Sequence, residues 1–435
     1  MSNPALCRYL KANSGAKFST CPPQKWNLAS LTLAGFYYNP AIAVAEARVR
    51  EAGAAIITAG ARPNPTIALG PQYEVRSSPN FVPWGLGMFS LSLPIQTAGK
   101  RGYRIAQAKR LAEAARIAAG ESAWAIRSRI RAALLRYLLD ARRSNLALAT
   151  ENEIAQTTAL IAQRVKAGGA SEPALNFALA DLQNARVKAI QARARAPEDR
   201  SVLAAAVGVP VKALNGIRIS WAGLDNPPSQ QWLSATAVQR LALLNRLDLR
   251  RELAQYAAAD DALKLEIARQ YPNLNFPMGY SWEGGENLFE LGPSLVLPVF
   301  NQNQGPIAQA EARRKEVAAR FLALQAGIIA QSSAALAAYR GALAALAAAR
   351  GAADFQAKRL DQVKRAVSAG ESDTLALATA RLEELAARQT MLESLADAQV
   401  ALGRLEDSMQ RPLDIGDAGS FAFPSAPIVN HRADP

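Results

Sequence analysis

Four segments of the chain alternate between apolar residues and small or polar residues, the pattern of a β-strand with two different faces. In the third segment Leu274, Phe276, Met278, Tyr280 and Trp282 share one face. The four segments are residues 66–76, 89–93, 273–282 and 289–297. Runs of about ten residues have the length of a tilted strand that crosses a membrane with its apolar side toward lipid. An ordinary sheet covered by helices on one face fits the alternation equally well.

Long alanine-rich runs follow each pair of strands, and their apolar residues recur at three- and four-residue steps. This period predicts α-helices, and at about 1.5 Å per residue the two longest span roughly 100 Å. Such rods are too long for a compact globule and are expected to pair as hairpins. The predicted long and returning helices are residues 100–167, 172–206, 306–369 and 373–409, and shorter helices precede the strands at 40–62 and 248–270.

The same order of elements occurs twice, about 200 residues apart. Gln24-Lys25-Trp26 corresponds to Gln230-Gln231-Trp232, and Ile105-Ala106-Gln107-Ala108 to Ile307-Ala308-Gln309-Ala310. Self-similarity on this scale indicates one structural unit used twice. The predicted divisions are an N-terminal leader at 1–25, a first repeat at 26–207, an inter-repeat segment at 208–229, a second repeat at 230–412 and an irregular tail at 413–435.

Four strands cannot form a closed barrel, and a β-structure that spans a membrane must have no open edge. If the strands cross a membrane, several chains must therefore each supply four of them. The sequence predicts an α+β membrane protein that is a homo-oligomer.

The formal net charge is +14 at pH 7, which is compatible with nucleic acid or anionic lipid as a partner. However, the basic residues are spread along the helices among acidic ones, as on the solvated faces of coiled coils. No nucleic-acid-binding motif occurs, so we expect no nucleic acid partner. A soluble coiled-coil scaffold that binds anionic partners remains the alternative from another functional class.

The chain carries no recognisable catalytic or cofactor-binding motif. Its single histidine, His431, lies in the proline-rich tail, and its two cysteines, Cys7 and Cys21, lie in the leader without metal-ligand spacing. We therefore predict no enzyme activity, no cofactor and no metal site. Cys7 is a weak match to a lipoprotein processing site. The sequence also lacks an apolar run of about 18 residues and a clear signal-peptide core, so Met1 is expected to be a truncated or misassigned start.

Three motifs resemble the TolC family of bacterial outer-membrane efflux proteins, and the resemblance covers residues 26–412. Two of them are similar to its metal-efflux branch, the outer-membrane components of cobalt–zinc–cadmium systems. The third resembles the family's Arg-Pro-Asp-Leu, with Leu247 in place of proline. The motifs are Leu91-Ser92-Leu93-Pro94-Ile95 with Gly99-Lys100-Arg101, then Leu297-Pro298-Val299-Phe300-Asn301-Gln302-Asn303-Gln304-Gly305, and Asn245-Arg246-Leu247-Asp248-Leu249.

The resemblance implies a homotrimer with a 12-stranded barrel in outer-membrane lipid and a long periplasmic coiled-coil barrel of helices. It also implies a periplasmic adaptor and an inner-membrane pump of the resistance–nodulation–division class, with this chain as the passive outer-membrane conduit for heavy-metal ions or small toxic compounds. The alternative is that the same kind of conduit exports secreted protein, as in type I secretion, or drugs.

The resemblance places adaptor docking at the two turns where the long helices reverse. Small residues there would allow a partner's helices to approach closely, although they could serve the turn alone. The docking residues implied are Gly168, Gly169, Ser171, Glu172, Gly370, Glu371, Ser372 and Asp373.

Some members of the family close the tunnel with acidic residues just inside these turns. Residues 375–379 of this chain contain none, so the tunnel entrance is assigned to Asp373 and, as a weaker candidate, to Asp181. As a lone charge, Asp181 is more readily explained as a solvated or paired side chain.

Overall fold

The computed structural model describes residues 3–13, 23–73, 84–229, 233–283 and 286–413. The chain divides into two compact units, which we call the strand unit and the helical unit. The strand unit comprises Ala47–Ala119 and Leu247–Gln325. The helical unit comprises Met1–Glu46, Gly120–Arg246 and Ala326–Pro435.

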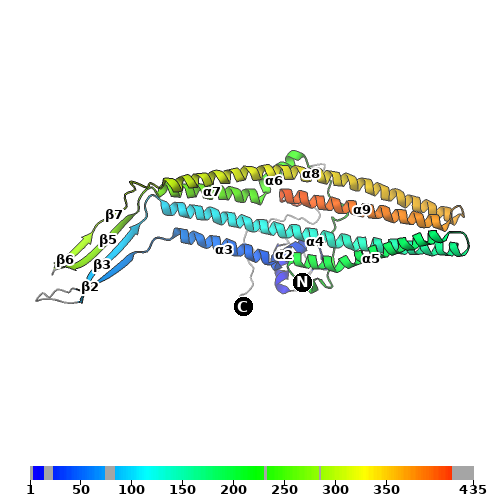
Figure 1. The fold of residues 1–435 in the computed structure, drawn as a ribbon, viewed down its shortest axis with the longest axis horizontal. Helices are drawn as coiled ribbons and strands as arrows, with labels where there is room; N and C mark the ends of the chain where they lie inside the picture. The colour runs from blue at the N-terminus through cyan, green and yellow to red at the C-terminus, as the bar shows by residue number, and fades with distance from the viewer. Residues whose placement is uncertain (1–2, 14–22, 74–83, 230–232, 284–285, 414–435) are drawn as a thin grey trace. The chain divides into compact units, whose positions relative to one another are not determined.

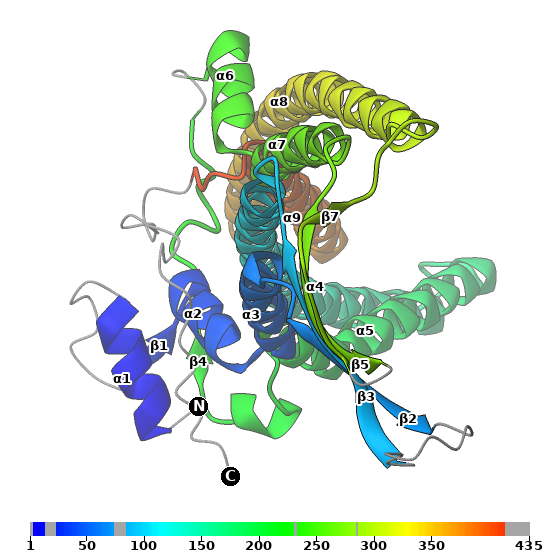
Figure 2. The ribbon, with the colours of Figure 1, turned by 90° about the vertical axis from the view of Figure 1, so that its left-hand side faces the viewer.

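The strand unit is built on one antiparallel sheet with the order β2-β3-β5-β6, in which the short β7 also pairs with β5 (Figure 1). The central β3–β5 pairing joins the two sequence repeats, with Phe89 opposite Tyr280. Figure 2 shows these strands nearly edge-on. The strands are β2 (Thr66–Tyr73), β3 (Trp84–Ile95), β5 (Leu274–Glu283), β6 (Glu286–Leu291) and β7 (Ser294–Leu295).

The strand bounds differ from the sequence prediction at two places. The second strand is longer than residues 89–93, because β3 begins at Trp84 and ends at Ile95. The fourth predicted strand, residues 289–297, is divided into β6 and β7 at Gly292-Pro293. Proline has no N–H group to donate to the sheet, so a strand is readily interrupted there.

Helices α3 (Pro40–Gly60) and α7 (Leu247–Ala268) belong largely to the strand unit, together with the first turns of α4 (Lys100–Lys166) and α8 (Gln304–Ser368). Lys100 fastens the start of α4 to the start of β5. Its Nζ donates to the carbonyl oxygen of Tyr271 at 2.5 Å and to Oδ1 of Asn273 at 2.6 Å. Burial, with the nearby Arg269 charge, lowers the pKa of Lys100. This residue of the Gly99-Lys100-Arg101 motif is therefore a structural clamp.

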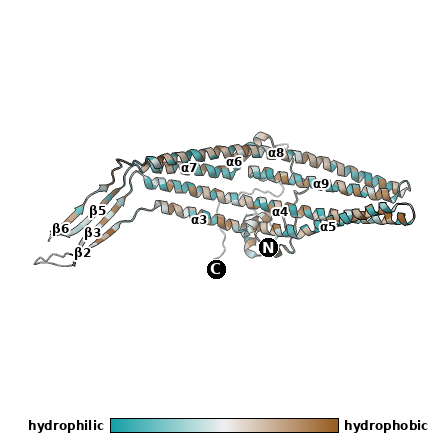
Figure 3. Ribbon diagram, viewed as in Figure 1, coloured by the Kyte–Doolittle hydropathy of each residue, from teal (hydrophilic) through white to brown (hydrophobic). Residues whose placement is uncertain are grey.

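The helical unit contains two hairpins in which α4 returns through α5 (Glu172–Val207) and α8 through α9 (Thr374–Met409). Along these helices hydrophobic and hydrophilic residues are mixed (Figure 3). The repeated order of helix, strand pair, long helix and returning helix agrees with the internal repeat seen in the sequence.

Short elements gather around the middle of the long helices within the helical unit. Trp26 and Ile219 pair in the parallel β1–β4 bridge, and the Asn27 side chain caps α2 by accepting from the Ser30 N–H at 2.9 Å. The elements are α1 (Pro4–Asn13), β1 (Lys25–Trp26), α2 (Leu28–Tyr38), η1 (Val211–Leu214), β4 (Arg218–Ile219) and α6 (Ala235–Asn245).

The core of the helical unit lies where α2, α4, α5 and α9 meet. Its fully buried side chains include Trp26, Leu31, Ile126, Ile130, Leu134 and Leu203.

A buried ionic cluster lies on the same helices. Glu406 of α9 accepts from Arg127 at 3.1 Å and lies 3.4 Å from Nε of Arg131, with all three side chains at most 6% exposed. Removal of one member would leave a buried charge without its partner, so we assign this cluster to holding α4 against α9.

One helix of the described chain is long and apolar enough in composition to cross a membrane, although the sequence predicts no such helix. Helix α8 contains an 18-residue window with a hydropathy of 1.5, and 22% of that window is buried. The bent pair α2 and α3 passes only when joined. Alanine supplies much of the hydropathy of α8. The helix therefore has the average composition of a membrane span, but it does not contain a run of large apolar side chains.

The N-terminal helix α1 is anchored to the helical unit. Leu6 and Leu10 are fully buried, and the ring of Tyr9 lies 5.5 Å from that of Tyr37. Cys7 is disulfide-bonded, a state typical of oxidising compartments such as the periplasm. The only other cysteine, Cys21, lies outside the described residues.

Candidate functional site: the hairpin tips and the adjoining groove

The first hairpin reverses between Lys166 and Glu172. Gly168 has a φ of +73°, a conformation that costs glycine little. The N–H of Gly169 donates to the Arg164 carbonyl at 2.8 Å and closes the end of α4. Ser171 precedes α5 without a side-chain capping bond. The turn therefore depends on Gly168, as the sequence predicted for its position.

The second hairpin uses the same turn at equivalent positions. Gly370 has a φ of +77°, and the N–H of Glu371 donates to the Ala366 carbonyl at 2.8 Å. Asp373 caps α9 by accepting a hydrogen bond from the Ala376 N–H at 2.7 Å.

The two tips differ at the residue after the essential glycine. Gly169 and Glu371 are equivalent in the turn, yet Gly169 has no positive φ, and a Cβ there would meet only the Arg164 carbonyl oxygen at 3.6 Å. That distance is an ordinary van der Waals contact. The backbone turn thus explains Gly168 and Gly370 but gives no reason for glycine at position 169.

Nearer the tips than the buried Arg127–Glu406 and Arg131–Glu406 pairs, three ion pairs join α4 to α9 and its N-cap residue, and we call these three the hairpin ladder. From the tip inward, Arg164 donates to Asp373 at 2.8 Å. Next, Arg381 lies 3.4 Å from Glu153, and deepest, Nε of Arg143 donates to Glu393 at 2.8 Å. The rungs run in opposite order along the two helices because α4 leads toward its tip and α9 away from its own.

The outer rung is exposed on both sides, with the Arg164 and Asp373 side chains 42% and 53% exposed. The hydrogen bond from Arg164, with that from the Ala376 backbone, lowers the pKa of Asp373, so its carboxylate stays ionised. Ion pairs in such positions are weak and are screened by salt. The outer rung can therefore open at small energetic cost.

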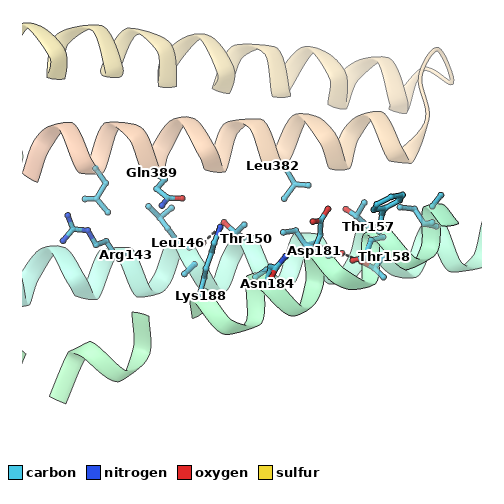
Figure 4. A pocket seen from close by; sticks show the side chains of 18 residues that line it. Arg143, Leu146, Thr150, Thr157, Thr158, Asp181, Asn184, Lys188, Leu382 and Gln389 are labelled. Atoms are coloured by element: carbon cyan, nitrogen blue, oxygen red, sulfur yellow. Dashed lines mark hydrogen bonds between the residues drawn. The ribbon is translucent and has the colours of Figure 1, made fainter. Parts of the chain in front are cut away.

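A groove of about 530 Å³ lies between the first hairpin and α9, alongside the ladder. In Figure 4, Leu382 and Gln389 extend from α9 toward the groove, and Asp181 and Lys188 of α5 border the opposite side. Phe177 also lines it and is 75% exposed. The mixture of apolar surface and charge is suited to a protein segment more than to a small apolar molecule.

Asp181 borders this groove and is exposed. It forms no ion pair with the described residues, in agreement with its reading as a solvated side chain. Asp373, by contrast, is engaged twice, as a helix cap and as a rung of the ladder. The two entrance candidates thus differ, and only Asp373 joins the hairpins.

The deepest rung continues into a carboxylate pair between α4 and α5. Arg143 also donates to Asp140 at 2.6 Å, and Asp140 lies beside Asp199, which is 1% exposed. Burial, with the neighbouring Asp140 carboxylate, raises the pKa of Asp199 to about 6, although Arg136 opposes the shift. The inner end of the ladder is thus packed into the core, whereas its outer end is solvated.

Within the described residues, no group of three or more histidine, cysteine or acidic side chains is placed to hold a metal ion.

The order of elements, the open sheet and the paired long hairpins define a class of outer-membrane channel subunit. Residues 37–209 and 238–409 match the family described as outer membrane efflux protein. The chain belongs to this family, whose members are outer-membrane channels and not enzymes.

The chain is 26% identical over 316 residues to the cobalt-zinc-cadmium resistance protein CzcC of Cupriavidus metallidurans, covering 70% of this chain and 71% of that protein. The fold is similar to VceC from Vibrio cholerae, with a TM-score of 0.71, 16% identity, and coverage of 88% of this chain and 96% of that one. The open state of the Neisseria gonorrhoeae MtrE channel gives a TM-score of 0.70 at 15% identity, with 89% of each chain covered.

Proposed function

We propose that three copies of this chain form the outer-membrane conduit of a tripartite efflux system of the resistance–nodulation–division type. This proposal rests mainly on the sheet of the strand unit, which has four strands if β6 and β7 are counted as one interrupted strand. Its edge strands β2 and β6 each lack a second neighbour among the described strands. An unpaired edge cannot remain in lipid, so copies must pair edge to edge. Three copies of four strands give the 12-stranded barrel that the family resemblance implies.

The cargo we propose is heavy-metal ions or small toxic compounds. Similarity to a cobalt-zinc-cadmium resistance protein supports this choice over secreted protein or drugs. The energy for export comes from an inner-membrane pump, because a passive tunnel has no chemistry of its own.

The hairpin tips are the proposed docking surface for a periplasmic adaptor, and the hairpin ladder is the proposed latch of the tunnel entrance. Residues of both tips take part: Gly168, Gly169, Ser171, Glu172, Gly370, Glu371, Ser372 and Asp373. Docking in the groove beside the ladder would compete with its weak outer rung and release the hairpins from each other. The open state recorded for the MtrE channel supports a tunnel that changes state.

Substitution Gly169→Arg tests the docking role. The turn tolerates a side chain here, so trimers form as in the wild type, but the bulky group blocks the approach of a partner's helices. The variant is expected to lose the zinc, cobalt and cadmium tolerance that the wild-type gene restores to a deletion strain. Minimal inhibitory concentrations of the three salts are the measurement.

The matched control is Gly351→Arg, since Gly351 on α8 also has open space around it. Full metal tolerance in Gly169→Arg would contradict docking at the first tip. If the deletion strain shows no metal phenotype but loses drug tolerance or secretion of a protein, the cargo assignment is wrong and the conduit remains.

A further inference from the structure

The sheet of the strand unit has two chemically different faces. On one face the rings of Tyr280 and Phe289 are 5.3 Å apart across β5 and β6. Apart from Asn287, the described side chains of this face are apolar or aromatic. They include Ile67, Leu69, Phe89, Leu91, Leu93, Phe276, Met278, Tyr280, Phe289 and Leu291. This face fits lipid, so the opposite face lines the lumen of the proposed barrel.

The lumen face is made largely of small or polar residues. Its described members are Thr66, Ala68, Gly70, Met88, Ser90, Ser92, Pro94, Asn275, Pro277, Gly279, Ser281, Glu286, Leu288 and Glu290. Met88 and Leu288 share one row of paired residues with Gly70 and Ser281.

Glu290 is the only long side chain in its row. It is paired with Gly279, which is paired with Ser90, which is paired with Ala68. A Cβ at position 279 would lie 3.4 Å from the Glu290 Cβ, so glycine leaves space beside the glutamate. Oε2 of Glu290 lies 3.6 Å from the same Cβ position, so the space that glycine leaves is filled by this carboxylate, one per chain on the lumen face.

The sign of charge on the strands is opposite to that of the whole chain. The chain has a net charge of +14, but the strands β2, β3, β5, β6 and β7 of this sheet contain no lysine or arginine. Glu286 and Glu290 both belong to the lumen face. Within the described strands of this sheet, therefore, no basic side chain opposes the field of these carboxylates.

In a 12-stranded barrel the lumen is narrow enough for the electric field of these carboxylates to act on ions that pass through it. Strands about 4.8 Å apart and tilted by about 40° give a backbone diameter of about 24 Å. Side chains narrow the free lumen further, so its radius is comparable to the Debye length of about 10 Å at 0.1 M salt. Rings of acidic side chains in a pore favour cations.

We propose that Glu290 determines the charge preference of the pore in its outer-membrane part, where three copies favour cations such as metal ions over anions. This assignment rests on the trimeric barrel proposed above. It locates the selective carboxylate within the barrel, in contrast to the position just inside the second tip, where residues 375–379 carry no acidic group.

The test is the cation-to-anion permeability ratio of purified channels in planar bilayers, measured from reversal potentials across a KCl gradient. Glu290→Cys is expected to lower the ratio. Reaction with a negatively charged methanethiosulfonate reagent should restore it toward the wild-type value, and a positively charged reagent should lower it further. Glu290→Gln, which keeps the side-chain shape, should shift the ratio in the same direction as Glu290→Cys.

Phe289→Cys is the matched control, because residue 289 is adjacent but belongs to the lipid face, and neither reagent should change its ratio. Wild-type channels treated with both reagents serve as the second control. If channels form and the ratio is the same in all Glu290 variants and after both reagents, the assignment is overturned. If wild-type protein forms no channels, the trimeric conduit fails, and this assignment fails with it.

Discussion

Charge reversal in the two outer rungs of the hairpin ladder is expected to make the outer membrane leaky. In the double variant Arg164→Glu, Arg381→Glu, each new glutamate faces a carboxylate, Asp373 or Glu153. Attraction between the hairpins becomes repulsion at the exposed outer rung and at the second rung, where the Glu153 side chain is only 12% exposed. Cells should become several-fold more sensitive to a large antibiotic that the outer membrane normally excludes, measured as its minimal inhibitory concentration.

The second rung also offers a rescue. Adding Glu153→Arg to the Arg381→Glu variant recreates an ion pair with reversed polarity, so sensitivity should return toward the wild-type value. Lys364→Glu is the control for a charge reversal outside the ladder, since among the described residues Lys364 pairs with Asp361 on its own helix. A double variant that is no more sensitive than this control would show that the ladder does not hold the entrance closed.

Substitution Gly208→Ala is expected to destabilise the helical unit strongly. Gly208 ends α5 with a φ of +84°, and a Cβ there would lie 2.7 Å from Cα of Asn39. A left-handed conformation costs a non-glycine residue roughly 1–2 kcal/mol. Overpacking against backbone, which cannot rotate away, adds about 1–3 kcal/mol. The unfolding temperature of the purified protein and its yield in the membrane should both fall.

Gly216→Ala separates the two causes. Gly216 has a φ of +75° but open space around its Cβ position. An alanine there would therefore have the cost of the left-handed backbone conformation without the cost of overpacking. The Gly216 variant should lose clearly less stability than the Gly208 variant. Equal losses at both positions would refute the close approach of Asn39 as the dominant cause.

Much of the architecture was predictable because its signals are local. Alternation along β5 and the three- and four-residue steps of α4 and α9 directly indicate strand and helix, and Gly168 and Gly370 indicate the turns. The split at Pro293 was missed, although the missing N–H of proline is a local signal that could have revealed it.

The hairpin ladder could not be derived in the same way. Its basic members resemble the many other exposed arginines of the helices, and which of them meets a carboxylate depends on how two helices far apart in sequence are aligned. One feature of the sequence is consistent with the ladder: Arg143, Glu153 and Arg164 are spaced about three helical turns apart on α4, which places them on one face of the helix. Their partners on α9 become identifiable only when that face is placed opposite them.

The assembly state tests the central claim most directly. Protein extracted from the outer membrane in mild detergent should have the mass of three 46.4 kDa chains by native mass spectrometry, because each chain supplies one open four-stranded sheet. A monomer or a dimer from the same membrane fraction would contradict the account.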